Sequence, residues 1–266
     1  MAIAPIERLD VPILREFQPD GWSDIRSAFE HYIAAPYCFP VKIAIKDKIV
    51  GIGSGILIGR TGWLAHIIVH HAHRRKGIGS MILDHLINFL RELSCETISL
   101  VATDQGYTVY KKAGFIKQTE YVLFERKEPL DAKLDSKNVR VFMHTDQEDI
   151  FRLDREVSGE ERGKILSDNL TGSWIYEEDG VATGFYLPEL GDGLTVASSP
   201  RAGIALMQIR LSQTNKGWLP FDNKDGIRFF KDNGFRELQR AKRMVLGRPF
   251  IWRPEKLYSR IGGNLG

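Results

Sequence analysis

The segment 63–93 limits most tightly how this chain can fold. Trp63-Leu-Ala-His-Ile-Ile-Val69 is an almost continuous apolar run, which is typical of a buried strand. Apolar residues then recur at helical spacing, so a helix is expected over 77–93. The connection between strand and helix is basic and rich in glycine, with Arg74, Arg75, Lys76, Gly77 and Gly79.

A basic, glycine-rich connection at a helix start suits a pyrophosphate. Free N–H groups and the positive end of the helix dipole attract an anion, and glycine has no Cβ to block close approach. A Walker A loop needs Gly-Lys-Ser/Thr after a four-residue gap, and no such segment exists. A dinucleotide fingerprint needs a third glycine where this chain has Ile82. The remaining alternative is a solvated basic turn.

The order of the predicted elements narrows the fold further. A helix over 22–32 and a hairpin of 41–46 with 49–58 precede strand 63–69. The helix 77–93, a strand over 97–103, a short helix ending at Gly114 and a strand over 120–126 follow. This order, with Arg74-x-x-Gly77-x-Gly79 and Tyr110-Lys-Lys-Ala-Gly-Phe115, resembles the GNAT acetyltransferase superfamily. Residues 20–126 would cover its whole core.

The resemblance implies that acetyl-CoA is the cosubstrate. Tyr110 stands four residues before the glycine of the Gly-Phe pair, where the family has the general acid beside the CoA sulfur. The alternative for Tyr110 is a ring packed on a helix face, and Tyr107 either lines the pantetheine channel or packs. The Val69 N–H matches the group that binds the thioester carbonyl. The implied cofactor-binding residues are Val69, Arg74, Arg75, Lys76, Gly77, Ile78, Gly79, Ser80, Thr103 and Tyr107.

The general base is less well defined by the sequence. Strand 63–69 has no carboxylate, and His66 is its one titratable residue. The ordinary pKa of histidine, about 6.5, suits a base near neutral pH. A hydrogen-bonded core histidine is the alternative, and Glu30 and Asp104 are other candidate bases.

A metal site is not expected. The imidazoles of His70, His71 and His73 have no carboxylate or cysteine ligand near them in the sequence, which makes a poor zinc site. They are expected to flank phosphates or to face solvent. His71 stands where the family often has proline.

The second half of the chain repeats the first at an offset of about 120 residues. Phe230-Lys-Asp-Asn-Gly-Phe235 parallels 110–115, and Arg201 follows Val196 by five residues, as Arg74 follows Val69. We therefore predict an α/β protein of two GNAT-like domains, each a mixed, mostly antiparallel central sheet flanked by helices. The predicted ranges are 1–130 for the catalytic domain, 127–137 for the linker, 139–247 for a degenerate GNAT-like domain and 248–266 for a C-terminal tail.

The second copy lacks the residues that the chemistry needs. Pro200 removes an N–H donor, Gly203 stands where the first copy has two glycines, and Phe230 has no hydroxyl. A packing or substrate-shaping role is therefore expected for this half.

Composition agrees with an ordinary globular enzyme. The 266 residues carry a net charge of +3, which is too small to indicate nucleic acid. Cys38 and Cys95 have no metal or redox spacing, and no signal peptide or membrane-spanning run is evident. A cytoplasmic protein is expected, and its oligomeric state is not indicated.

The predicted activity is acetyl transfer from acetyl-CoA to a primary amine by direct attack, with Tyr110 as general acid and His66 as candidate base. The acceptor is a small amine or a peptide N-terminus. The rival is a non-catalytic regulatory module that binds acyl-CoA or a metabolite. Binding alone does not require a tyrosine hydroxyl, so Tyr110 favours the enzyme.

Overall fold

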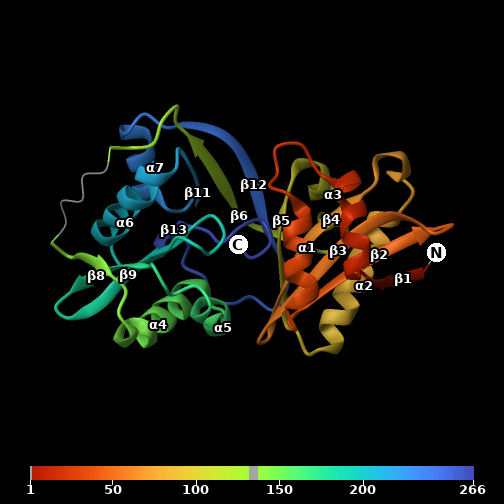
Figure 1. Cartoon of the computed structure of the whole chain (residues 1–266), viewed down its shortest axis with the longest axis horizontal. Helices are drawn as coiled ribbons and strands as arrows, with labels where there is room; N and C mark the ends of the chain where they lie inside the picture. The colour runs from red at the N-terminus through yellow and green to blue at the C-terminus, as the bar shows by residue number, and fades with distance from the viewer. Residues whose placement is uncertain (1, 132–136) are drawn as a thin grey trace. The chain divides into compact units, whose positions relative to one another are not determined.

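The computed structural model describes residues 2–131 and 137–266; residues 132–136 of the predicted linker lie outside the described residues. The chain divides into two compact units (Figure 1). The first unit contains the residues up to Leu100 with Thr108–Phe115 and Val245–Arg248, and the remainder forms the second. Each unit therefore consists of several separate segments of the chain, whereas the predicted domains 1–130 and 139–247 are continuous.

The first unit contains a mixed sheet in the order β1-β2-β3-β4-β5. Neighbours from β1 to β4 are antiparallel, and β4 and β5 are parallel. The β2–β3 hairpin closes at Lys46 and Asp47, both with positive φ, which suits a tight two-residue turn. The strands are β1 (Ala2–Pro5), β2 (Cys38–Ile45), β3 (Lys48–Ile58), β4 (Thr61–Val69) and β5 (Thr97–Ala102).

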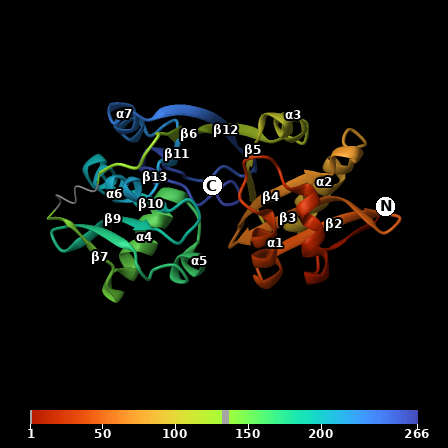
Figure 2. The same ribbon diagram turned by 45° about the horizontal axis from the view of Figure 1, so that its top comes forward.

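Helices α1 (Ile25–Ala34) and α2 (Ile78–Glu92) cover opposite faces of this sheet (Figures 1 and 2). Close packing of α2 depends on glycines in β3, because a Cβ at Gly51 would lie 2.7 Å from Cγ2 of Ile78. The short helices η1 (Arg8–Phe17) and η2 (His71–His73) precede α1 and α2 respectively. The predicted helix 77–93 is confirmed to within a residue at each end.

The second unit contains an antiparallel sheet in the order β13-β10-β9-β8-β7 and an antiparallel pair of β6 with β11. Its strands are β6 (Ile116–Glu125), β7 (Val139–Val141), β8 (Trp174–Glu178), β9 (Val181–Leu187), β10 (Leu194–Ala197), β11 (Lys216–Pro220) and β13 (Leu257–Ser259). Its helices are η3 (His144–Asp146), α4 (Gln147–Ser158), α5 (Gly163–Ser167), α6 (Pro200–Gln213), α7 (Lys224–Asp232) and η4 (Pro254–Lys256).

Three elements contribute residues to both units, and β5 is divided after Leu100. Helix α3 (Asp104–Lys112) has its start in the second unit and its end in the first. Strand β12 (Arg236–Gly247) belongs to the second unit as far as Met244. Its last residues lie in the first unit, where the Arg248 N–H donates to the Glu96 carbonyl at 3.0 Å.

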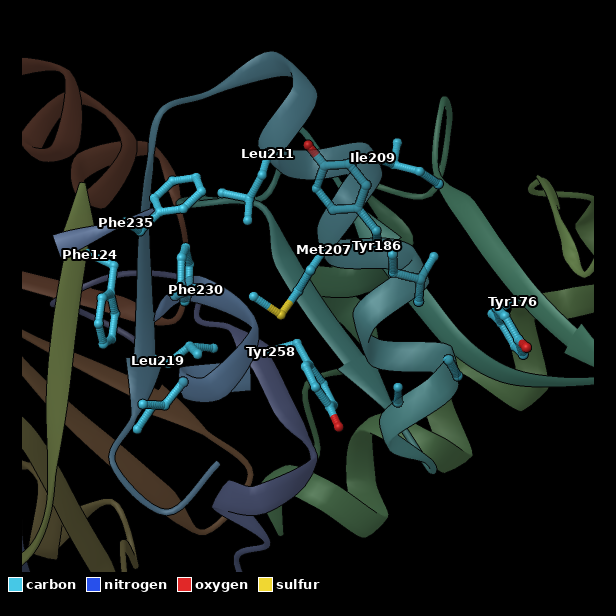
Figure 3. Packing of buried hydrophobic residues seen from close by; sticks show 14 of the residues in the cluster. Phe124, Tyr176, Tyr186, Met207, Ile209, Leu211, Leu219, Phe230, Phe235 and Tyr258 are labelled. Carbon is cyan, nitrogen blue, oxygen red and sulfur yellow. The ribbon is translucent and has the colours of Figure 1, made fainter. Parts of the chain in front are cut away.

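The core of the second unit surrounds α6 and α7 (Figure 3). The Phe230 ring stacks on Phe124 at 4.8 Å and meets Phe235 edge-on at 4.9 Å. Segment 248–266, predicted as a tail, contributes β13 to the sheet and buries Tyr258 in this core. No helix in the described part of the chain is both long and apolar enough to cross a bilayer.

Candidate active site

An unpaired strand edge begins halfway along β4. The parallel register joins Thr61–Leu64 of β4 to Thr97–Leu100 of β5 and ends there, whereas β4 continues to Val69. Over the described residues, the last part of β4 therefore has one edge without a strand neighbour. Such an edge presents backbone N–H and C=O groups that an extended ligand with amide groups can pair with.

The Val69 N–H points to this unpaired edge. His70 is opposite Val50, and its N–H donates to the Val50 carbonyl at 3.0 Å. Val69 is opposite Gly51, one position earlier in the same antiparallel ladder. Hydrogen-bonded and non-hydrogen-bonded pairs alternate along such a ladder, so the Val69 N–H faces away from β3.

His66 lies at a β-bulge in β4. The register with β3 shifts between Ile52 and Ser54, and His66 has a φ of 49°. A positive φ is uncommon outside glycine, but a bulge re-aims a side chain and accommodates it. The bulge directs the imidazole towards α1, where Nδ1 lies 2.9 Å from the hydroxyl of the buried Tyr32.

Aromatic rings surround the His66 imidazole. The centroids of Trp22, Phe29 and Tyr32 lie 5.6–5.8 Å from that of the imidazole. Burial lowers the pKa of His66 to about 4, because an apolar environment disfavours the charged form. The imidazole is therefore neutral at pH 7.

Trp22 lies in a turn before α1 rather than inside the helix. Helix α1 begins at Ile25 because the Asp24 carboxylate accepts the Arg26 N–H at 3.0 Å, which makes Asp24 the N-cap. The Gln18 amide holds the preceding turn by donating to the carbonyls of Pro19, Trp22 and Ser23. Trp22 is thus held beside His66 while 45% of it remains exposed.

The start of α2 has unsatisfied donors. Its N-cap is Gly77, which has a φ of 81° and no side chain to cap the helix. The first intrahelical bond runs from the Met81 N–H to the Gly77 carbonyl at 3.0 Å. The N–H groups of Ile78, Gly79 and Ser80 therefore have no partner within the helix, which is the condition for anion binding.

Gly79 is a glycine for which the fold itself has no need. Its φ is not in the left-handed region, and a Cβ there would meet only Cγ2 of Val69, at an ordinary 3.5 Å. Gly77, by contrast, needs to be glycine because of its positive φ. Packing therefore does not explain why this position is glycine.

The basic residues of the loop are exposed. The Arg74 guanidinium donates to the Val69 carbonyl at 3.3 Å, and the Lys76 ammonium donates to the Ala72 carbonyl at 3.4 Å. Arg75 is exposed with a φ of 62°. The Ile78 side chain is buried in the core, so only its main chain is available to a ligand.

The predicted residues on α3 and just before it belong to different units. Tyr110, in the first unit, is half-buried, and burial raises its pKa to about 12. Thr103 and Tyr107 lie in the second unit, where the Thr103 carbonyl accepts the Tyr107 N–H at 3.0 Å. Asp104 forms an ion pair of 2.5 Å with Lys242, and Glu30 is exposed.

In the second unit, the start of α6 and the edge of β10 correspond to the start of α2 and the edge of β4, and both are occupied by other residues of the same unit. The Ser199 hydroxyl caps α6 by accepting the Ala202 N–H at 3.3 Å, and Pro200 has no N–H to offer. Strand β13 pairs with the edge of β10 at Thr195 and Val196. A Cβ at Gly203 would lie 2.2 Å from the ring of Tyr258. The Tyr258 ring therefore fills the space beside Gly203.

Two residues near His66 were not predicted from the sequence as part of its surroundings. The sequence offers Tyr32, with Trp22, Tyr37 and Phe39, as an apolar wall of the acceptor site or as a core residue, and it indicates no role for Gln18. The one sequence signal for these surroundings is that Phe29 and Tyr32 lie three residues apart in the predicted helix 22–32, which also contains Trp22. Nothing in that pattern indicates a hydrogen bond to a residue 34 positions away.

The comparisons with known proteins agree with this geometry. The sequence profile described as "Acetyltransferase (GNAT) family" matches residues 4–115. A putative acetyltransferase from Pyrococcus horikoshii has a TM-score of 0.83 at 22% identity, covering 100% of this chain and 95% of that chain. A GCN5-related N-acetyltransferase from Sphaerobacter thermophilus has a TM-score of 0.66 at 14% identity, covering 94% and 97%. A tandem GNAT protein from the clavulanic acid biosynthesis pathway has a TM-score of 0.60 at 13% identity, covering 94% and 99%.

Residues 4–115 thus form a domain of the GNAT acetyltransferase family, and the whole chain has the fold of a tandem GNAT protein. A search of curated proteins gave no match. The predicted fold class of two GNAT-like domains is confirmed, although the β7–β10 sheet with β13 is entirely antiparallel rather than mixed. Among the described residues, no group of three or more His, Cys, Asp or Glu is placed to hold a metal ion.

Proposed function

We propose that the chain is an N-acetyltransferase that moves an acetyl group from acetyl-CoA to a primary amine. The observation that carries this proposal is the uncapped start of α2 beside the unpaired edge of β4. The free N–H groups at the start of α2 can bind the phosphates of CoA, and the unpaired edge of β4 can pair with the amides of its pantetheine arm. A protein that only packs a helix on a sheet needs neither.

The cofactor phosphates would bind the N–H groups of Ile78, Gly79 and Ser80, with Arg74, Arg75 and Lys76 supplying positive charge. The pantetheine arm would pair with the edge of β4. Thr103 and Tyr107 are proposed to contact the same arm. The Val69 N–H, which the ladder directs away from β3, would donate to the thioester carbonyl and stabilise the negative charge that develops there.

Tyr110 is proposed as the general acid. Its raised pKa keeps the phenol protonated at neutral pH, so the proton is available when the CoA thiolate leaves. A thiol in the same environment would also have a raised pKa, as burial does to Cys38, whose pKa rises to about 12. The two shifts have the same direction, so proton transfer from phenol to thiolate remains feasible.

His66 is proposed as the base, with a limited task. Free alkyl amines have a pKa of about 10.4, and an imidazole with a pKa of about 4 cannot deprotonate an ammonium efficiently. The amine must therefore arrive neutral. Once its nitrogen is bonded to the carbonyl carbon, its remaining protons become far more acidic, and the neutral imidazole can accept one of them.

The test is an acetyl-CoA consumption screen across small amines and peptides that follows thiol release. Tyr110→Phe is expected to lower turnover about 10²–10⁴-fold with little change in the Kd for acetyl-CoA, because only the proton donor is lost. Tyr186→Phe is the matched control, since burial also raises the pKa of Tyr186 but it lies in the core of the second unit. Full turnover by Tyr110→Phe would remove this residue from the mechanism.

The rival function, a non-catalytic acyl-CoA-binding module, predicts a different result. It would bind CoA through the same loop but release no thiol with any amine. Binding without turnover across the whole screen, in a chain of unchanged stability, would favour this rival.

A further inference from the structure

A buried phenol, that of Tyr32, is the polar partner of the proposed base. Tyr32 lies on α1 with 1% of its surface exposed, and its hydroxyl is 2.9 Å from Nδ1 of His66. In the described part of the chain, no hydrogen bond joins the imidazole to any other side chain. The two ring nitrogens of His66 therefore differ, because Nδ1 has a partner in the protein and Nε2 remains for a bound molecule.

The other close neighbours of the imidazole are aromatic rings. Trp22 and Phe29 both meet it edge-on, with centroids at 5.8 Å. Phenylalanine has no hydrogen-bonding group, and the indole of tryptophan can only donate. Among the described residues, the Tyr32 hydroxyl is therefore the side-chain acceptor available to a hydrogen on Nδ1.

The hydrogen bond also fixes the orientation of the ring. The β-bulge directs the side chain of His66 towards α1, but the last torsion of a histidine side chain is broad and roughly two-fold. Turning the ring over would take Nδ1 away from the Tyr32 hydroxyl. The contact thus selects one of two ring orientations that the backbone alone permits.

We infer that Tyr32 is a positioning residue for the proposed reaction: its oxygen accepts the hydrogen of Nδ1 and keeps the lone pair of His66 on Nε2, where it meets the acceptor amine. This inference rests on the proposed function, because it takes His66 as the base. A hydroxyl can donate as well as accept, so the pair alone permits either tautomer. The base role requires hydrogen on Nδ1, since the other tautomer places the lone pair against the phenol.

The proton transfer then involves one nitrogen of the ring. After the amine nitrogen has bonded to the carbonyl carbon, one of its N–H bonds breaks and an N–H bond forms at Nε2. The electron pair of the broken bond stays on the amine nitrogen, and the imidazole becomes an imidazolium with hydrogen on both nitrogens. The Nδ1–H continues to donate to Tyr32, which neither gains nor loses a proton.

Loss of the hydroxyl should lower the rate rather than cofactor binding. In Tyr32→Phe the ring and its contact with Phe29 remain, but the Nδ1–H faces no acceptor. A buried donor without a partner is costly, and more so when it carries charge, so both the productive tautomer and the imidazolium are disfavoured. We expect kcat to fall about 10- to 100-fold. The KM for acetyl-CoA should not change, because Tyr32 lies on α1 and not in the loop 74–80.

The experiment compares kcat and the KM for acetyl-CoA in the full chain, with the best acceptor from the amine screen. The matched control is Tyr186→Phe, which removes a buried hydroxyl from the core of the second unit and should leave kcat unchanged. Urea unfolding of both variants separates a loss of stability from a loss of rate. A tyrosine with a merely structural role would lower stability and leave kcat as it is.

NMR of the chain with isotope-labelled histidine tests the tautomer without any acceptor. The His66 signals, assigned by their loss in His66→Asn, should show hydrogen on Nδ1 in the unmodified chain and a larger share of the Nε2–H form in Tyr32→Phe. Hydrogen on Nε2 in the unmodified chain, or an unchanged kcat in Tyr32→Phe, would overturn the inference and leave acetyl transfer standing. If the unmodified chain acetylates no amine, the proposed function fails instead, and the spectrum still decides whether Tyr32 sets the tautomer.

Discussion

The two glycines at the start of α2 should respond differently to the same substitution. Gly77 has a φ of 81°, and an alanine there adopts a left-handed conformation that costs about 1–2 kcal/mol. Gly79→Ala has no such cost, because φ is ordinary and the new Cβ meets Cγ2 of Val69 at 3.5 Å. Alanine is the better helix former by up to about 1 kcal/mol, so Gly79→Ala should be at least as stable as the unmodified chain.

The effect on CoA binding should not follow the effect on stability. Apart from its chain neighbours and the backbone of its own helix, a Cβ at Gly79 would have Cγ2 of Val69 as its one described neighbour within 4 Å, and the pyrophosphate is proposed to lie beside it. We expect Gly79→Ala to raise the Kd for CoA at least tenfold, or about 1.4 kcal/mol. A stabilised protein with weakened binding is the result that a purely structural turn cannot give.

The measurements are urea unfolding and calorimetry with CoA. Gly163→Ala is the matched control, since Gly163 is the first residue of α5 and a Cβ there would lie 3.6 Å from Phe151. The control should leave the Kd for CoA unchanged. An unchanged Kd for Gly79→Ala would refute the placement of the pyrophosphate, and a large loss of stability would refute the packing argument.

Three further outcomes follow from the geometry. Because the pKa of His66 is about 4 when folded and about 6.5 when unfolded, the unfolded state binds the proton first, and stability should fall by about 2 kcal/mol between pH 7 and pH 5. His66→Asn, which tolerates a positive φ, should lose that fall in urea unfolding. Gly203→Ala should destabilise the chain by about 1–3 kcal/mol by crowding Tyr258, and a double-mutant cycle with Tyr258→Ala should show the penalty relieved. Calorimetry should give one CoA per chain, and two sites would contradict the view that β13 and Ser199 close the second unit.

The parts of the fold that the sequence predicts well are those with local signals. Strand β4, helix α2 and the loop between them have an apolar run, a helical period and a basic glycine turn within one stretch of 31 residues, 63–93. The loop residues 74–80 are consecutive, so a correct prediction of this turn also locates most of the candidate site. The repeated motif 230–235 is also visible within one short segment of the sequence. The Phe230 ring stacks on Phe124, which agrees with the packing role predicted for this half.

The parts that escaped prediction depend on distant partners. β13 is three residues long and pairs with β10, about 60 residues earlier, which no pattern in Leu257–Ser259 indicates. The environment of His66 depends on a bulge and on the Tyr32 hydroxyl, 34 residues away. Helix α1 begins three residues later than predicted, because Asp24 caps it while Trp22 lies in the turn held by Gln18.

The two halves of the chain answer the same physical requirement in different ways. Every helix start leaves backbone donors that need acceptors, and every strand that diverges from its neighbour leaves an edge to be covered. In the second unit the Ser199 hydroxyl, the missing N–H of Pro200 and strand β13 meet these needs from within. In the first unit α2 has no side-chain cap and the end of β4 has no parallel partner among the described residues. A retained glycine is therefore weak evidence for a ligand by itself: Gly203 accommodates a tyrosine ring, whereas a Cβ at Gly79 would meet only Cγ2 of Val69, at an ordinary 3.5 Å.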